Sequence, residues 1–235
     1  MSVPERRAMI EIKNLTKEYV QGRSRIAALK DVTLTLKEGM TAIVGTSGAG
    51  KSTLLHVLSG MEPFERGSVT IDDVPIAGLS EKEMAGFRNR NIGMVMQQYS
   101  LIPDFSVLEN VWLPLTFSEK RCRKNERLEL AKQAVRTVGI EELTERPVDT
   151  LSGGQMQRVA IARAIVNSPR YLFADEPTGA LDGENTEKIL EVFRKIAEGG
   201  VCVLIVTHDM HVAECCRRIV RLEDGQIVSN REAAR

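Results

Sequence analysis

The chain has 235 residues, of which 43% are apolar and 4% aromatic, and its 32 basic and 32 acidic side chains cancel to a formal charge of +0. This length supports one large folded domain, or two small ones, with a core of its own, and the charged residues spread through an apolar-rich chain argue against disorder. The lack of excess positive charge disfavours a protein that binds nucleic acid or anionic membranes through bulk electrostatics. Any anion is therefore expected to be bound by a local group of residues.

The first fifteen residues, MSVPERRAMIEIKNL, carry Pro, Glu and Arg where a signal peptide needs an apolar stretch, so export by that route is not expected. An apolar run such as 201–206 is far shorter than the roughly 20 residues of a membrane-spanning helix. The cysteines form no CxxC unit and are expected to be reduced thiols: Cys122, Cys202, Cys215 and Cys216. Together these features predict a soluble, cytoplasmic protein.

Taken in chain order, the first part is predicted to be rich in strands. Short strands are expected where apolar and polar residues alternate or where an apolar run is bounded by turn residues: 9–15, 32–36, 40–44, 67–71 and 74–76. Asp72 and Asp73 supply the turn of a hairpin between the last two strands. A glycine-rich turn after the strand at 40–44 leads into a helix at about 51–58.

The middle of the chain, from about 81 to 165, is predicted to be mostly helical around one strand that ends at about residue 96. Ser106 and Glu109 form a capping box that opens one helix, and Gly139 ends another. The last part returns to strands at 171–174 and 201–206, a helix at about 186–197 and a hairpin at Asp224-Gly225. This order predicts a single α/β domain with a mainly parallel sheet.

Residues 45–52, GTSGAGKS, match GxxxxGK[ST] between a predicted strand and a predicted helix. Glycines let such a loop curl until its backbone N–H groups surround phosphate oxygens at the helix N-terminus. Lys51 is expected to reach the β- and γ-phosphates and the Ser52 hydroxyl to hold Mg²⁺. The predicted phosphate-binding residues are Gly45, Thr46, Ser47, Gly48, Ala49, Gly50, Lys51, Ser52 and Thr53.

Two adjacent acids end the predicted strand in residues 170–176, RYLFADE. Asp175, at the end of the strand, is expected to join Ser52 in holding the metal. Glu176, one residue further, is expected to act as the general base toward an attacking water.

A second phosphate-binding surface is predicted in residues 151–155, LSGGQ, which we call the signature segment. Ser152 and Gln155 form a capping box, while Gly153 and Gly154 leave backbone N–H groups bare at a helix N-terminus. With the phosphate loop before it and the DE strand after it, this segment resembles that of ATP-binding-cassette (ABC) proteins, over nearly the whole chain. The resemblance implies a P-loop NTPase (RecA-like) core, an N-terminal antiparallel β-subdomain and an α-helical subdomain inserted at about 81–165, in one nucleotide-binding domain spanning 1–235.

The resemblance also assigns roles to single residues. Tyr19 stands where the family stacks an aromatic ring on adenine, although a lone tyrosine after a strand packs in the fold about as often. Gln97 matches the glutamine that joins the metal site to the helical subdomain and takes part in catalysis, with Gln98 leaving the register open. Asp182 matches an aspartate at the dimer interface, and His208 matches the histidine that contacts the γ-phosphate.

In this family two subunits meet head to tail, and each ATP lies between the phosphate loop of one and the signature segment of the other. Residues 98–115 and the DEPTGALD string most resemble exporters of the macrolide-efflux, lipoprotein-release and antimicrobial-peptide-resistance type. The resemblance implies an ATPase homodimer that uses Mg²⁺, contacts the inner face of the cell membrane only through a membrane-spanning permease and binds no nucleic acid. The stretch 98–115 is expected to contribute a groove for the permease or, equally, to pack in the core.

Two other functions remain open from the sequence. One is a soluble ABC ATPase of translation, DNA repair or cluster assembly, although such proteins usually carry two cassettes, long coiled coils or distinct inserts. The other is a regulatory module that binds ATP without turnover, which Glu176 and His208 disfavour. The end at Arg235 is expected to leave no room for the regulatory domain of many sugar importers.

Overall fold

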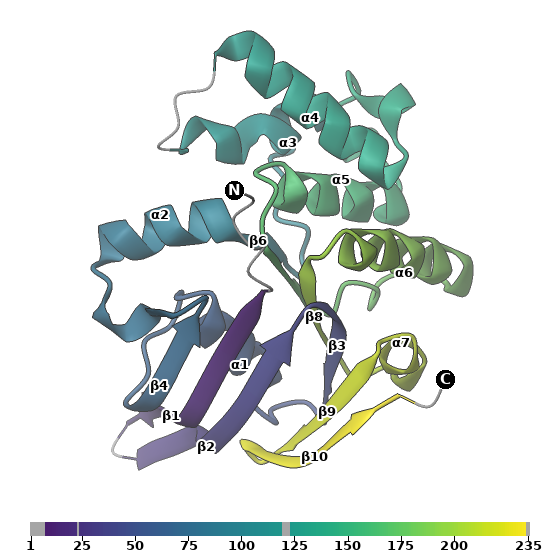
Figure 1. The fold of residues 1–235 in the computed structure, drawn as a ribbon. Helices are drawn as coiled ribbons and strands as arrows, with labels where there is room; N and C mark the ends of the chain where they lie inside the picture. The colour runs from purple at the N-terminus through teal and green to yellow at the C-terminus, as the bar shows by residue number, and fades with distance from the viewer. Residues whose placement is uncertain (1–7, 23, 119–122, 234–235) are drawn as a thin grey trace, which may run out of the picture.

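The computed structural model describes residues 8–22, 24–118 and 123–233, which form two sheets and a group of helices (Figure 1). A four-stranded antiparallel sheet has the order β2-β1-β4-β5, and a six-stranded sheet has the order β10-β9-β3-β8-β7-β6. The strands are β1 (Met9–Gln21), β2 (Ser24–Lys37), β3 (Gly39–Val44), β4 (Arg66–Ile71), β5 (Val74–Pro75), β6 (Ile92–Val95), β7 (Tyr171–Asp175), β8 (Cys202–Thr207), β9 (Arg218–Glu223) and β10 (Gln226–Glu232).

The α-helices are α1 (Lys51–Leu58), α2 (Glu81–Asn91), α3 (Val107–Thr116), α4 (Lys124–Val138), α5 (Gly153–Ile165), α6 (Gly183–Glu198) and α7 (Met210–Glu214). Short 3₁₀ turns lie at Ile76–Gly78, Glu141–Leu143 and Val148–Thr150. In the part of the chain that the structure describes, no helix combines the length and apolar character needed to cross a membrane.

The six-stranded sheet is parallel except at one edge. β3 pairs with β8 and β9, and β7 pairs with β8 and β6, all in parallel, whereas β10 returns antiparallel to β9. Asp224 and Gly225, both at positive φ, make the predicted turn of that last hairpin. Placing β3 between strands from the far end of the sequence brings the loops after β3, β7 and β8 to one edge.

The six-stranded sheet has a hydrophobic core on each face, because its side chains alternate along each strand. Tyr171 and Phe173 of β7 pack with α1 and the antiparallel sheet, whereas Leu172 and Ala174 pack with the helices on the other face. In Figure 1 α3, α4 and α5 form a group above the sheets, and β1, β2 and β4 lie at the lower left. The central sheet thus carries a β-rich layer on one side and helices on the other.

The helical region predicted from about 81 to 165 is interrupted by β6, which belongs to the six-stranded sheet beside β7. Of the helices in this region, α3 and α4 pack on each other and on α5, whereas α5 also packs on β6. Two details of their prediction are confirmed: Ser106 and Glu109 form a capping box at α3, and α4 ends at Gly139 with φ 67°. Residues 119–122, with Cys122, lie outside the described residues.

The strands β1 and β2 are longer than predicted. The sequence indicated 9–15 and 32–36, whereas the pairing continues to the hairpin end, with Tyr19 opposite Ile26. Residues 16–21, TKEYVQ, do not alternate apolar and polar side chains, so the sequence pattern ends early, and cross-strand pairing extends the strands.

Candidate functional site

The phosphate loop, residues 45–52, connects β3 to α1 and surrounds the Lys51 side chain. Lys51 Nζ donates hydrogen bonds to the carbonyl oxygens of Gly45 at 2.9 Å and Thr46 at 3.0 Å, and Lys51 is 8% exposed. Gly50 precedes α1 at φ 99°, and no side chain caps the helix. The first N–H groups of α1 are therefore available to an anion.

Glycine is required at two positions of this loop by close packing. A Cβ on Gly45 would lie 2.1 Å from the carbonyl oxygen of Leu222, and one on Gly50 would lie 2.3 Å from that of Ala28. Neither backbone atom can move away without displacing a strand. The loop conformation is therefore fixed by β2 and β9 as well as by its own sequence.

A cavity of about 520 Å³, here called the P-loop cavity, lies beside this loop. It collects residues from the ends of β6, β7 and β8 as well as from the loop and β2. The lining residues are Ala28, Ser47, Gly48, Gly50, Lys51, Ser52, Thr53, Gln97, Asp175, Glu176 and His208. Gln97 rather than Gln98 lines the cavity, which resolves the register that the sequence left open.

Glu176 and His208 meet at the mouth of the cavity. His208 Nδ1 lies 2.8 Å from Glu176 Oε1, and the Thr207 hydroxyl donates a hydrogen bond of 3.2 Å to Glu176 Oε2. The backbone N–H of Glu176 donates to the Val206 carbonyl at 2.8 Å, and Glu176 has φ 46°. A left-handed conformation is unfavourable for glutamate, so the end of β8 holds this carboxylate in a strained, defined position.

Asp175 ends β7 and is 7% exposed. Its Oδ1 atom is buried and has no hydrogen-bond partner. A buried carboxylate oxygen is costly unless a donor or a cation satisfies it. No group of three His, Cys, Asp or Glu side chains suited to a metal ion occurs among the described residues, so a cation here would need further ligands from hydroxyls, amides or a bound anion.

The signature segment forms the predicted capping box at the start of α5. Gln155 N donates to Ser152 Oγ at 3.4 Å, and Ser152 N donates to Gln155 Oε1 at 2.9 Å. A Cβ on Gly154 would lie 2.8 Å from Asn185 Oδ1, and one on Gly153 would lie 3.2 Å from the Tyr99 hydroxyl. A larger residue at Gly154 would require the Asn185 side chain to move, and one at Gly153 would press on the Tyr99 hydroxyl.

Asp182 caps α6 next to the signature segment. Its carboxylate accepts hydrogen bonds from Asn185 N at 2.8 Å and Asn185 Nδ2 at 2.9 Å, and these bonds lower the pKa of Asp182. Asn185 is thus hydrogen-bonded to Asp182 and lies beside Gly154. None of the residues Ser152, Gly153, Gly154, Gln155 and Asp182 lines the P-loop cavity, so one chain presents two separate surfaces.

Tyr19 lies on β1 and also stands outside the P-loop cavity. Tyr19 is 37% exposed, and it lies opposite Ile26 in the hairpin. Ala28, two residues further along β2, lines the cavity, so the hairpin connects Tyr19 to the phosphate loop.

Sequence reasoning missed Thr207 and Ala28. A polar residue that ends an apolar strand next to His208 could have indicated Thr207. Nothing in the sequence distinguishes Ala28 from other small residues of β2, because its role depends on the close approach to Gly50.

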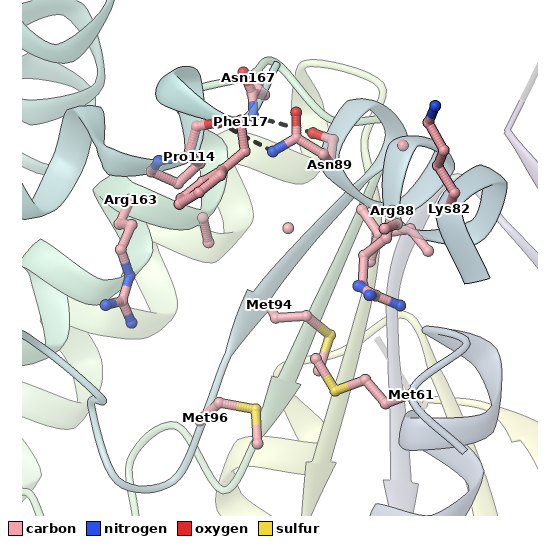
Figure 2. Close-up of a pocket in the computed structure, with 15 residues that line it drawn as sticks. Met61, Lys82, Arg88, Asn89, Met94, Met96, Pro114, Phe117, Arg163 and Asn167 are labelled. Carbon is pink, nitrogen blue, oxygen red and sulfur yellow. Dashed lines mark hydrogen bonds between the residues drawn. The ribbon is translucent and has the colours of Figure 1, made fainter. Parts of the chain in front are cut away.

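A second cavity, of about 620 Å³, is lined by residues of α2, β6, α3 and α5 and of the segments next to them (Figure 2). We call it the α2–α5 groove. Its apolar surface includes Met61, Met94, Met96, Pro114 and Phe117, with Lys82, Arg88 and Arg163 also lining it. Phe117 is 73% exposed, which is unusual for a phenylalanine without a partner.

Figure 2 shows Asn89 and Asn167 at one end of the groove beside Pro114. Asn89 Nδ2 donates to the Pro114 carbonyl at 3.0 Å, whereas Asn89 Oδ1 is buried without a partner. Of the stretch 98–115, for which the sequence left a groove and core packing equally open, only Pro114 lines this groove. Trp112 and Leu101 of this stretch pack against the core instead.

Arg163 connects the groove to the loop that follows Gln97. Its guanidinium donates to the carbonyl oxygens of Ser100 at 2.5 Å and Tyr99 at 2.7 Å, and burial lowers the pKa of Arg163. Since Arg163 lies on α5, it joins the Gln97 loop to the helix that begins at the signature segment.

Comparison with known proteins finds the same arrangement. Residues 29–179 match the family described as ABC transporter. The chain is 44% identical to the ABC transporter ATP-binding protein MJ0796 of Methanocaldococcus jannaschii, covering 93% of this chain and 95% of that protein. A dimeric structure of the MJ0796 cassette superposes with a TM-score of 0.89 at 40% identity, covering 96% of this chain and 99% of that one. Another structure, with the same TM-score, is a post-hydrolysis state bound to ADP and Pi.

Two further relatives are named for export or release systems. The chain is 41% identical to the lipoprotein-releasing system ATP-binding protein LolD of Syntrophotalea carbinolica, covering 94% of this chain and 97% of LolD. It is 39% identical to the macrolide export ATP-binding/permease protein MacB of Bdellovibrio bacteriovorus, covering 94% of this chain but 34% of MacB. The predicted fold class and the predicted family are thereby confirmed, and the chain belongs to the ABC transporter family as a nucleotide-binding cassette.

Proposed function

We propose that this chain is the ATP-hydrolysing subunit of a membrane exporter and that one cassette, residues 1–235 with a helical region at about 81–165, works as half of an ATPase pair. The observation that carries the proposal is the P-loop cavity, which joins a phosphate loop, a buried unpaired carboxylate oxygen and the pair of Glu176 and His208. These are the parts that phosphoryl transfer to water requires.

ATP binds with its phosphates on residues 45–53. The bare N–H groups of α1 and the Lys51 ammonium supply positive charge, and Lys51 exchanges its carbonyl partners for phosphate oxygens. The adenine ring stacks on Tyr19, which is 37% exposed.

Mg²⁺ fits the polar groups beside the phosphates. Asp175 Oδ1 lacks a partner, and the Ser52 hydroxyl and the Gln97 amide line the same cavity. Magnesium is typically held by one or two carboxylates together with substrate phosphates and water, which suits a site with few acidic ligands. When bound, the ion neutralises charge that develops on the phosphate oxygens.

Glu176 acts as the general base that accepts a proton from the attacking water. Thr207 and His208 hold its two carboxylate oxygens, so the base is oriented before the substrate arrives. His208 is 70% exposed at its side chain and so can contact the γ-phosphate while it remains beside Glu176. Gln97 orients the water and links the site to the helical region.

Each ATP is completed by a second copy of the chain. Ser152, Gly153, Gly154, Gln155 and Asp182 lie outside the P-loop cavity of their own chain, and the N-terminus of α5 presents bare N–H groups. A head-to-tail pair would place this surface against the γ-phosphate held by the partner, and the similar MJ0796 cassette has a dimeric structure. Hydrolysis removes the phosphate that holds the pair closed.

The α2–α5 groove receives the permease, which positions the chain at the cytoplasmic face of the cell membrane. Methionine-rich apolar surfaces adapt to helices of a partner, and the exposed Phe117 and the three basic side chains suit a short helix with apolar and acidic residues. LolD and MacB, named for lipoprotein release and macrolide export, favour an exporter over a soluble ATPase.

Phosphate release by the purified chain with ATP and Mg²⁺ tests the proposed activity. The variant Lys51→Ala should lose nucleotide binding, whereas Lys132→Ala, on the exposed surface of α4, should bind like the wild type. Equal binding by both variants would contradict the role of the phosphate loop. Purification from native membranes tests the transport role, since a multi-span membrane protein should accompany the wild type and be lost with Phe117→Asp.

A further inference from the structure

Lys17 is a buried cation that lies against the ring of Tyr19. Lys17 is 5% exposed, and its Nζ is 4.9 Å from the centroid of the Tyr19 ring. A lysine is rarely buried in a fold unless it is paired. A cation within about 6 Å of an aromatic centroid is attracted by the negative face of the ring.

Two glutamates from another part of the chain hold this ammonium group. Lys17 Nζ lies 3.7 Å from Glu62 Oε2 and 3.4 Å from Glu65 Oε1, and the two carboxylates are 36% and 37% exposed. Glu65 also binds the backbone of β1, because its Oε2 accepts a hydrogen bond of 2.7 Å from Glu18 N. The end of β1 that carries Tyr19 is thus bound to Glu62 and Glu65 by ion pairs and by a backbone hydrogen bond.

These glutamates belong to the segment that connects α1 to β4. The phosphate loop leads directly into α1, so Lys17 ties the tyrosine to the same helix that presents its N-terminus to the phosphates. Tyr19 is therefore linked to the segment that follows α1 as well as to the phosphate loop through the hairpin.

We propose that Lys17 is a positioning residue for recognition of the nucleotide base, an inference that rests on the proposed stacking of adenine on Tyr19. The ammonium group occupies one face of the ring and leaves the other for the purine. It fixes the ring orientation and draws π-electron density toward itself, which reduces repulsion between the ring and the π-face of the base. Lys17 thereby adds to the binding of the base and not to the binding of the phosphates or to hydrolysis.

The test compares ligands with and without a base. Dissociation constants for ADP and for pyrophosphate are measured by calorimetry, and KM and kcat are measured with ATP. The variant Lys17→Met keeps the length of the side chain and removes its charge, and the half-exposed Glu62 and Glu65 can then be hydrated. Lys13→Met is the matched control, because Lys13 lies on the same strand, is 65% exposed and pairs with Glu11.

Lys17→Met should weaken the binding of ADP about three- to tenfold and raise the KM for ATP by a similar factor. The binding of pyrophosphate and the kcat should stay unchanged. Lys17→Arg should restore ADP binding, because guanidinium also stacks on aromatic rings. In a Tyr19→Ala background, Lys17→Met should have no further effect. Equal weakening of ADP and pyrophosphate, an effect that persists without Tyr19, or unchanged ADP binding would each overturn the proposal.

The experiments distinguish failure of the Lys17 proposal from failure of the proposed ATPase function. If Tyr19→Ala binds ADP like the wild type, the stacking role and this inference both fail, while ATP hydrolysis by the wild type still stands. If the wild type does not hydrolyse ATP, the proposed function itself is contradicted, whatever the ADP measurements give.

Discussion

The imidazole of His208 and the carboxylate of Glu176 meet at 2.8 Å across the ends of β7 and β8, although 31 residues lie between them in the chain. The contact is possible because β7 and β8 are neighbours in the parallel sheet, with Asp175 opposite Val206. Thr207 binds the other oxygen of the same carboxylate. Two consecutive residues, Thr207 and His208, therefore hold the two oxygens of the Glu176 carboxylate, and a change in either residue is expected to move the carboxylate.

Replacing Glu176 with Gln should nearly abolish ATP turnover without preventing ATP binding. The side-chain amide of glutamine cannot accept the proton of the attacking water, and the loss of a general base typically lowers the rate about 10²–10⁴-fold. Because hydrolysis no longer opens the pair, an ATP-bound dimer should accumulate, which size-exclusion chromatography detects. Glu129→Gln, on the exposed surface of α4, serves as the control. Wild-type turnover in Glu176→Gln would contradict the assignment of the base.

His208→Ala should lower kcat, and most of this loss should depend on Glu176. If the histidine acts by orienting the carboxylate and contacting the γ-phosphate, removing it from a chain that already carries Glu176→Gln should cost little more. Residues that act as a unit show such non-additive effects. Single-turnover rates of the two single variants and of the double variant measure how strongly His208 and Glu176 depend on each other. Losses that multiply would mean that the two residues act independently.

Local signals in the sequence predicted some elements with their bounds. The helix at 51–58 and the capping boxes of Ser106 and Ser152 depend on neighbours three or four residues away, and the structure confirms them. Most residues that line the P-loop cavity were named from motifs that each occupy one short segment of the sequence.

Features that depend on distant residues could not be read in the same way. The insertion of β3 between β8 and β9 depends on pairing across most of the chain. Lys17 carries no sign of burial in the sequence, because its partners Glu62 and Glu65 are brought to it only by the fold. The α2–α5 groove likewise combines Met61, Met94 and Phe117 from separate elements.

Ser152→Arg should leave nucleotide binding by the single chain intact and prevent the ATP-bound dimer. Ser152 lies on the second phosphate surface and not in the P-loop cavity, so a bulky cation there obstructs only the partner's nucleotide. Dimer formation is measured with ATP in the Glu176→Gln background.

Ser80→Arg is the matched control for this variant. Ser80 forms the same kind of capping box, with Glu83 at the start of α2, so its loss removes a comparable cap worth about 1 kcal/mol. Ser80→Arg should dimerise normally. A normal dimer from Ser152→Arg would show that the signature segment does not face the partner's ATP.

Tyr171→Phe should destabilise the chain, because the Tyr171 hydroxyl joins the two sheets. It donates to Asp72 Oδ1 at 2.5 Å and accepts from Met9 N at 2.9 Å, while Arg170 binds the other oxygen of Asp72 at 2.6 Å. Losing the hydroxyl leaves Asp72 paired with Arg170, so the free energy of unfolding should fall by about 1–2 kcal/mol. Denaturant unfolding measures this loss, and Tyr99→Phe provides a tyrosine control without a comparable network.

The same variant should change how stability depends on pH. Burial and the hydrogen bond to Asp72 raise the pKa of Tyr171 in the folded chain, so folding opposes its ionisation. The contribution of the neutral hydroxyl is present in full below the unfolded pKa of about 10 and is lost as the pH rises above it. The wild type should therefore lose stability more steeply than Tyr171→Phe above about pH 10. Parallel curves for the two proteins in this range would contradict the assignment of Tyr171 as the buried link between the sheets.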